Sequence, residues 1–502
     1  MKTTLPDNKQ SFFDRPYAIL FGIVAVMTIF YTLQCTFFQN ILGLDVLETI
    51  IWGEAGGLGN AKHPPLSGWL GFHISALAGH ADWIMYLAAQ LCIATGVIFT
   101  VKCAECYFKK GYEAVTAGLL LYFLFYYNPS ETKFCTYPLE IAILPATFYF
   151  FLKIRQNNFW RYWIGFAVCT ALGLLNKYSF GLYLVAMAVI FFRDKDFRAT
   201  LKSAKPYVAI ALCIALLLPH LHWLIQNDFI CFKHVSNRLE DDHPAWLFLL
   251  AIATALYPFA MLGAVMLAAT FPRRERGDLR KNAGFESLII SAIPALTLVV
   301  LSIADMGIIM MWFCPMASFA GIMAVAYFPF KIDKLIFKRI ILLLTVFSLA
   351  MYIFTTIDVA CSSRPRLHSE PDSLATPALA YWREFRNDDI PVVVGPRFEA
   401  AVLENYLPGR PQACELGDPV VLDICKEKIK KRGALLVVKS RYLKRPEYVA
   451  LLNEFFAEMN MPKPELKEVK YNFSARFGKQ KEENFFLGYL PPEETASPTI
   501  SR

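Results

Sequence analysis

Long apolar blocks are the feature of this chain that most constrains its fold. Eleven of them recur between residues 17 and 357, and several approach the ~20 residues that an α-helix needs to cross a bilayer. Only 18% of the 502 residues are charged, whereas soluble domains carry about 25%. A soluble fold of this size would therefore lack the charge to cover its surface. The pattern predicts a polytopic α-helical membrane protein.

We expect about eleven membrane-spanning helices from these blocks. The first and the last five are strongly apolar, whereas those between 113 and 192 are short and interrupted by polar residues, which leaves the count open by one pair. Residues 17–35 lack a small-residue cleavage site and are expected to be a retained signal anchor. The expected spans are 17–35, 83–101, 113–127, 138–152, 162–175, 178–192, 207–225, 245–270, 286–304, 307–329 and 340–357.

The positive charge is distributed unevenly between the loops. A formal net charge of +8 would suit a nucleic-acid-binding protein, but 23 Lys and Arg residues lie in alternate loops on one side of the predicted spans and five on the other. Basic loops stay in the cytoplasm when a membrane protein inserts. We therefore expect a cytoplasmic N-terminus, an outer-face C-terminus after eleven spans, and no nucleic-acid partner.

Residues 361–502 differ in composition from the rest of the chain, because they are rich in charged residues and proline. Their pattern predicts three strands, at 390–394, 434–438 and 485–490, and three helices, at 373–386, 420–431 and 446–459. We predict a transmembrane domain over 1–360 and a small soluble α/β domain over 361–502. The second domain would stand on the outer, periplasmic face of the membrane.

The first outer loop, residues 36–82, is longer than a connection between two spans requires, and it carries Asp45 and Glu48. The two carboxylates are three residues apart and would share one face of a helix. One of them could act as a general base while the other orients it or holds a cation. Alternatively, Asp45 merely caps a helix over 46–54, a position that suits Asp. The spacing favours neither alternative.

The same loop ends in Lys62, His63 and two prolines. Proline cannot continue a helix, so the pair could hold Lys62 and His63 at a fixed height, although a simple loop break is the commoner meaning of two prolines. The apolar run 66–78 that follows suits a helix lying in the membrane interface.

Other cations lie in the remaining outer segments. Lys133 belongs to a polar loop, and Lys177 occupies a very short turn. His234 and Arg238 are four residues apart, so they would be neighbours on a helical face that could clamp a phosphate. His234 with a carboxylate could also help to bind a divalent metal. An ordinary solvated loop is the alternative for this segment.

The first outer loop resembles that of the dolichyl-phosphate-mannose-protein mannosyltransferase superfamily, and the bacterial aminoarabinose transferases that act on lipid A are closest in style. The resemblance covers roughly residues 15–240 and implies a multispan fold of the GT-C type. The matching positions are Leu44, Asp45, Glu48, Trp52, Gly53, Lys62, His63, Pro64, Pro65, Leu66, Trp69 and Leu70, followed by the runs 173–178 and 219–228.

The resemblance implies a glycosyltransferase that takes a sugar from a polyprenyl-phosphate carrier at the outer face of the bacterial inner membrane and passes it to a lipid, glycan or protein acceptor. The catalytic Asp of that family maps onto Asp45, and Glu48 is the candidate for a second acid. Candidate contacts to the substrate and its phosphate are Lys62, His63, Lys133, Lys177, His234 and Arg238.

The chain departs from the aminoarabinose transferases at one position that bears on cofactors. Those enzymes carry Glu-Lys before the two prolines, where this chain has Lys62 and His63. The carboxylate that would help to bind a metal is therefore missing. We assign no cofactor with certainty, and a divalent metal near His234 stays open.

The implied chemistry needs few groups. A polyprenyl phosphate is a good leaving group, so a base for the acceptor hydroxyl and cations for the departing phosphate suffice. An apolar groove between spans would hold the isoprenoid chain among the membrane lipids. One-step displacement would invert the anomeric centre, which is the habit of the family.

A transporter or flippase of a lipid-linked or small substrate is the alternative function. Transporters usually place ionisable residues in the middle of their spans and show repeated halves. Here the acids gather in outer loops and no internal repeat is visible. Chemistry at the membrane surface is therefore favoured over transport.

Overall fold

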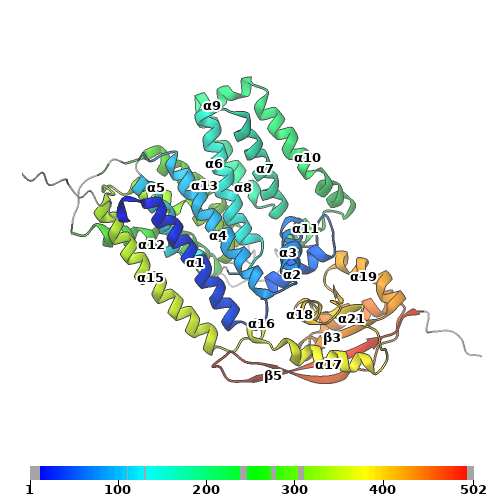
Figure 1. The fold of residues 1–502 in the computed structure, drawn as a ribbon. Helices are drawn as coiled ribbons and strands as arrows, with labels where there is room; N and C mark the ends of the chain where they lie inside the picture. Colours follow the sequence, from blue (N-terminus) through cyan, green and yellow to red (C-terminus); the bar gives the residue numbers. More distant parts are fainter. Residues whose placement is uncertain are drawn as a thin grey trace, which may run out of the picture.

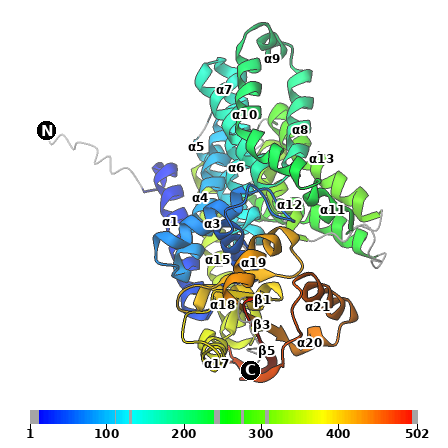
Figure 2. The same cartoon turned by 90° about the vertical axis from the view of Figure 1, so that its right-hand side faces the viewer.

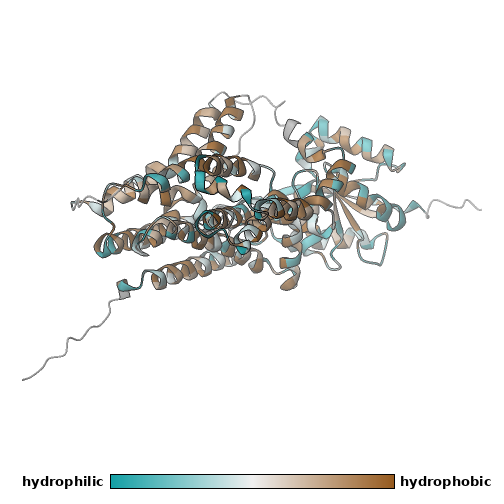
Figure 3. Ribbon diagram, turned by 90° about the horizontal axis from the view of Figure 1, so that it is seen from above, coloured by the Kyte–Doolittle hydropathy of each residue, from teal (hydrophilic) through white to brown (hydrophobic). Residues whose placement is uncertain are grey.

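A bundle of long helices forms one part of the molecule, and a smaller α/β layer packs against one end of it (Figures 1 and 2). Hydrophobic residues dominate the long helices, whereas hydrophilic residues are frequent in the α/β layer (Figure 3). The computed structural model describes residues 12–109, 111–128, 132–237, 246–272, 277, 279–303 and 310–493.

Eight helical segments among the described residues are long and apolar enough to cross a membrane. The chain is therefore a multi-pass membrane protein, as predicted. Seven segments are continuous helices: α1 (Pro16–Phe38), α4 (Asp82–Glu105), α6 (Thr136–Asn157), α10 (Lys205–Gln226), α12 (Leu247–Thr270), α13 (Lys281–Ile303) and α15 (Lys334–Cys361). The eighth, Met310–Tyr327, consists of η6 (Met310–Phe313), η7 (Pro315–Phe319) and α14 (Ala320–Tyr327).

The other three predicted spans are shorter than the eight. The block 113–127 forms α5 (Gly111–Leu119) and then tightens into the 3₁₀ turns η2 (Leu120–Phe123) and η3 (Phe125–Tyr127). The remaining two blocks form α7 (Trp160–Asn176) and α8 (Phe180–Arg193), of 17 and 14 residues. The number of eleven spans therefore stays a prediction.

Local sequence sets where two of the helices begin. The Asp333 side chain accepts hydrogen bonds from the backbone N–H groups of Leu335 and Ile336, which starts α15. Asp194 caps α9 (Lys195–Ala199) in the same way, and α9 with η5 (Thr200–Lys202) joins α8 to α10. These capped ends lie away from the α/β layer (Figure 1).

The first outer loop forms two closely packed helices, α2 (Leu44–Glu54) and α3 (Leu66–Leu77). A Cβ atom at Gly53 would lie 2.1 Å from the carbonyl oxygen of Gly68, so the crossing requires glycine at that point. The predicted helix over 66–78 is confirmed as α3, while its position in the membrane interface stays a prediction.

The tail forms a five-stranded sheet of order β2-β1-β3-β5-β4. β1 (Val392–Gly395) runs parallel to β2 (Gln412–Glu415) and β3 (Ala434–Lys439), and β5 (Lys481–Leu490) is antiparallel to β3 and β4 (Lys467–Phe473). The predicted strands are the three inner ones. The sequence analysis missed both edge strands: β2 has only two apolar residues between polar ends, and the alternating pattern of β4 was overlooked.

Helices cover this sheet. The three predicted helices form α17 (Pro371–Arg383), α19 (Pro419–Arg432) and α21 (Pro446–Glu458). Two short helices, α16 (Pro365–His368) and α20 (Ser440–Leu443), and the longer α18 (Arg397–Tyr406) were not predicted.

Helix α18 packs directly on α2, so the tail and the first outer loop share one core. A single hydrophobic cluster contains Val46 and Ile50 of α2 together with Phe398 and Leu403 of α18. The Leu42 backbone N–H also donates to the Tyr406 hydroxyl at 2.9 Å. The division into domains 1–360 and 361–502 stays a prediction, because side chains on both sides of it build this common core.

Candidate functional site

A cavity of about 460 Å³ lies between the first outer loop and the helical bundle. Its charged end is formed by Asp45, Glu48, Lys62, His63 and Lys177. The other lining residues are mainly apolar and come from α8, α11 (Ile230–Asn237), α13 and η6–η7: Leu182, Tyr183, Phe232, Pro294, Leu298, Leu301, Met311, Trp312 and Met316. The cavity thus suits an apolar ligand with an anionic head.

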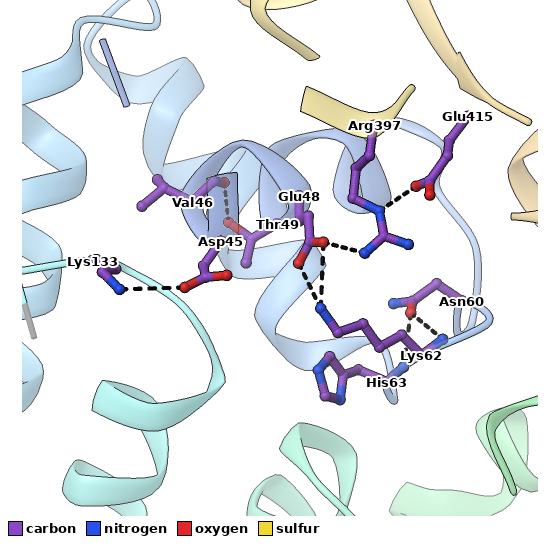
Figure 4. A network of polar contacts seen from close by, with 10 residues as sticks. All are labelled: Asp45, Val46, Glu48, Thr49, Asn60, Lys62, His63, Lys133, Arg397 and Glu415. Atoms are coloured by element: carbon purple, nitrogen blue, oxygen red, sulfur yellow. Dashed lines mark hydrogen bonds and ion pairs between the residues drawn. The ribbon is translucent and has the colours of Figure 1, made fainter. Parts of the chain in front are cut away.

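Asp45 lies in the first turn of α2 and faces this cavity. The helix starts at Leu44, after Gly43, whose carbonyl accepts the Val46 and Leu47 N–H groups, and no side chain caps it. The alternative that Asp45 is an N-cap is therefore wrong: the helix begins two residues too early for that role. Asp45 Oδ2 lies 3.5 Å from Lys133 Nζ, and the Asp45 side chain is 32% exposed (Figure 4).

Glu48 lies one turn further along α2, and its side chain is only 4% exposed. Lys62 Nζ is 3.0 Å from Oε2 and 3.3 Å from Oε1, and Arg397 Nη1 is 2.5 Å from Oε1 (Figure 4). Both carboxylate oxygens are therefore held by cations. Asp45 and Glu48 lie on the same face of α2, as predicted. Asp45 is partly exposed beside Lys133, whereas Glu48 is buried between Lys62 and Arg397.

Asn60 fixes the backbone of Lys62 and His63. Its Oδ1 accepts both backbone N–H groups, at 2.9 and 2.8 Å (Figure 4). The Lys62 ammonium also lies 5.7 Å from the ring centre of Trp52, and the His63 ring meets the same indole edge-on. The turn that Asn60 closes thus helps to hold the side chains of Lys62 and His63 in place. The prediction attributed this role to the two prolines alone.

Lys177 enters the cavity from the turn between α7 and α8. Its Nζ lies 4.5 Å from the ring centre of Tyr137, 5.6 Å from that of Trp312, and 4.0 Å from Oε2 of the buried Glu140. A cation lined by aromatic faces and one distant carboxylate is only partly neutralised. It can therefore attract an anion into the cavity.

Tyr178, the next residue, ties this turn to the first outer loop. His220 Nδ1 is 2.6 Å from the Leu58 carbonyl and must donate to it, so in the neutral imidazole Nε2 accepts from the Tyr178 hydroxyl at 2.7 Å. The Cys231 thiol donates to the Asn60 carbonyl at 3.0 Å. These contacts hold the loop over the cavity.

Two predicted residues cannot be placed. His234 belongs to helix α11, but its side chain is outside the described part of the structure, and Arg238 lies outside the described residues altogether. Among the described residues, we find no group of three or more His, Cys, Asp or Glu side chains that could hold a metal ion.

The structure brings Asp45, Glu48, Lys62, His63 and Lys177 together at the cavity and places Lys133 beside Asp45. The sequence analysis missed Arg397 and the aromatic lining. No local signal identifies Arg397, which is 349 positions from its partner Glu48. Trp312 fell within a predicted span and was counted only as an apolar residue.

A second group of charges joins α2 to the tail outside the cavity. Arg410 Nη2 lies 3.1 Å from Glu54 Oε2 and 3.9 Å from Oε1 of Glu404, which is buried. Burial, with the nearby Glu54, raises the pKa of Glu404 well above its ordinary value of 4.5. The protonated carboxyl is therefore favoured in the folded state.

This shift predicts a pH-dependent stability. Because folding favours protonated Glu404, the free energy of unfolding should fall as the pH rises above 4.5 through the raised pKa. Burial also raises the pKa values of Glu399, Glu415 and Asp418, so Glu404→Gln should reduce the slope without abolishing it. The check is Tm in detergent from pH 4.5 to ~8, the range reached by buried Glu residues.

The matched control is Glu427→Gln on the exposed face of α19, which should leave the slope as in wild type. Identical pH profiles for wild type and Glu404→Gln would contradict the prediction.

Comparison with known sequences gives matches over parts of the chain. A family model described as dolichyl-phosphate-mannose-protein mannosyltransferase matches residues 62–223. The curated relatives include the lipopolysaccharide core galacturonosyltransferases RgtA and RgtB of Rhizobium johnstonii, each 21% identical. The RgtA alignment covers 55% of this chain and 57% of RgtA. The RgtB alignment covers 59% of this chain and 61% of RgtB. The chain thus matches less than two thirds of either relative's length.

Solved structures match over nearly the whole chain. ArnT from Cupriavidus metallidurans bound to undecaprenyl phosphate is 15% identical with a TM-score of 0.62, covering 94% of this chain and 98% of ArnT. The apo structure of the same protein is also 15% identical, with a TM-score of 0.60, and the match covers 97% of this chain and 100% of ArnT. The chain has the fold of the GT-C glycosyltransferases. The fold that the resemblance in the first outer loop implies is thereby confirmed.

In this fold the first outer loop and the tail meet: α2 and α3 lie next to α18 and α19 (Figure 1), and α2 shares a hydrophobic cluster with α18. Both sequence relatives are galacturonosyltransferases by name, and the matching family model is described as a mannosyltransferase. The roles of the individual cavity residues stay predictions.

Proposed function

We propose that the chain is an integral membrane glycosyltransferase that moves a sugar from a polyprenyl-phosphate carrier to a lipid, glycan or protein acceptor. The observation that carries this proposal is the composition of the cavity, where Asp45, Lys62 and Lys177 share one end and the remaining wall is mainly apolar. The likeness to ArnT, one structure of which holds undecaprenyl phosphate, supports a carrier of this class.

Asp45 is the proposed general base. The acceptor hydroxyl oxygen attacks the anomeric carbon of the sugar, and Asp45 takes the hydroxyl proton. The bond between that carbon and the phosphate oxygen breaks, and polyprenyl phosphate leaves with the electron pair. Glu48 is less suited to this role, because Lys62 and Arg397 hold both of its oxygens. Such a single displacement inverts the anomeric centre.

Lys62 and Lys177 are the proposed cations for the departing phosphate, since fixed positive charge beside developing negative charge lowers the barrier. His63 lines the same end of the cavity, and Lys133 pairs with Asp45 there. His234 and Arg238 are proposed as further phosphate contacts on the resemblance alone.

The proposed location is the bacterial inner membrane, with a cytoplasmic N-terminus and a periplasmic tail. Helices α1 and α15 end beside the tail, whereas α4, α6 and α8 end at the opposite side of the bundle (Figure 1). Basic residues at those opposite ends include Lys102, Arg155 and Arg193. This distribution supports a cytoplasmic position for that side.

Sugar transfer by the purified protein in lipid nanodiscs tests the proposal. Labelled polyprenyl-phosphate sugars would be supplied as donors and a membrane lipid extract as acceptor. We expect label in the acceptor and release of the polyprenyl phosphate. If no donor supports transfer, and the protein instead moves a labelled carrier across vesicle membranes, the function is transport and the proposal is wrong.

A further inference from the structure

Arg397 is the first residue of α18, and its guanidinium bridges the tail to the first outer loop. Nη1 lies 2.5 Å from Glu48 Oε1, and Nε lies 2.5 Å from Glu415 Oε2 (Figure 4). Its side chain is 29% exposed, and Arg397 is not among the residues that line the cavity. It therefore does not touch a ligand in the cavity, and its contacts reach the cavity through Glu48 and Lys62.

The sheet fixes the starting point of this bridge. β1 ends at Gly395, which pairs in register with Glu415 at the end of β2. Pro396 then turns the chain, and Arg397 begins α18 directly beside Glu415. A guanidinium held by a carboxylate on its own domain loses little freedom when it binds a second one.

The contacts continue from Arg397 to the cavity. Glu48 accepts from Arg397 on one oxygen and from Lys62 on both, and Lys62 lines the cavity. A single carboxylate shared by two cations neutralises neither of them completely. Arg397 therefore leaves more of the positive charge of Lys62 available to the cavity, and it fixes the position of that ammonium group.

We propose that Arg397 is a positioning residue through which the tail completes the site for the carrier phosphate: acting on Glu48, it sets the place and the effective charge of Lys62. This inference rests on the proposed function, since the ligand is the polyprenyl phosphate of that reaction. The affinity of the donor site for the carrier phosphate then depends on the tail.

Binding of undecaprenyl phosphate to the full-length protein in nanodiscs tests the inference. Arg397→Gln should raise the Kd about tenfold, a typical coupling between charges in one network. Undecaprenol, which lacks the phosphate, should bind wild type and variant alike. If Lys62 transmits the effect, Arg397→Gln should add little further loss in a Lys62→Met background.

Arg410→Gln is the matched control. It removes another ion pair between the tail and α2, the one to Glu54, and neither of those residues lines the cavity. The Kd of this variant should stay within about twofold of wild type. Because Arg397→Gln leaves the half-buried Glu415 without its cation, the variant Arg397→Gln/Glu415→Gln should be measured beside it, with Tm for each protein.

The inference is overturned if both Arg397 variants bind undecaprenyl phosphate like wild type. It is also overturned if Arg410→Gln weakens binding as much as they do, or if the losses from Arg397 and Lys62 simply add. Failure of the proposed function gives a different result. In that case wild type binds the carrier and Arg397→Gln raises the Kd as expected, but wild type transfers no sugar from any donor. A wild type that does not bind the carrier contradicts both.

Discussion

Replacing Asp45 with Asn is expected to lower the rate of sugar transfer by ~10²- to 10⁴-fold, the usual effect of removing a general base. The amide keeps the shape of the side chain but cannot accept the proton of the acceptor hydroxyl. Loss of the ion pair with Lys133, both partly exposed, should change stability little. Single-turnover rates with a labelled donor, measured beside Tm and carrier affinity, check this expectation.

Glu54→Gln provides the control for Asp45, because Glu54 lies at the other end of α2 and outside the cavity. It should transfer sugar at nearly the wild-type rate. Undiminished transfer by Asp45→Asn would move the base to another carboxylate, with Glu48 as the first to examine. Loss of carrier binding in Asp45→Asn would instead indicate that the residue holds the donor.

Replacing Lys177 with Met should weaken binding of undecaprenyl phosphate by at least ~30-fold, since truncating one partner of a desolvated charge pair costs ~2 kcal/mol or more. The variant should also lose stability, because Glu140 is then buried without its cation, an effect of ~3–5 kcal/mol in comparable pairs. Affinity and Tm therefore need to be measured together.

A double variant separates these two effects. Lys177→Met/Glu140→Gln removes the unpaired carboxylate, so Tm should recover while the affinity stays low. Lys102→Met, which breaks an exposed pair with Glu105 at the opposite end of the bundle, should leave both unchanged. Carrier binding at wild-type strength by the double variant would remove Lys177 from the phosphate site.

The elements with a strong local pattern could be predicted from the sequence. Apolar length located the candidate spans, and continuous apolar runs located β1, β3 and β5. In the edge strand β4, Val469, Tyr471 and Phe473 alternate with polar residues, a strand signal that was overlooked, whereas β2 has only two apolar residues between polar ends. The span count stays a prediction where a helix changes to 3₁₀ turns, as after Leu119.

The candidate site was predictable only in part, for a similar reason. Helical spacing placed Asp45 and Glu48 on one face, since that relation is local. The pair Lys62–Glu48 depends on how the loop folds back over α2, and the pair Arg397–Glu48 on how the tail packs, so neither is encoded in nearby residues. Contacts between residues that lie far apart in the sequence can be identified only from the three-dimensional structure.

The shared core of α2 and α18 has a consequence for the biosynthesis of the protein. Every candidate span in the described residues precedes residue 362, so a nascent chain can insert its membrane part before α18 emerges from the ribosome. Until then, Val46 and Ile50 lack their covering side chains, and Glu48 lacks its second cation. A segment translated after the membrane part thus completes the loop, and a product truncated before α18 would leave this apolar surface exposed.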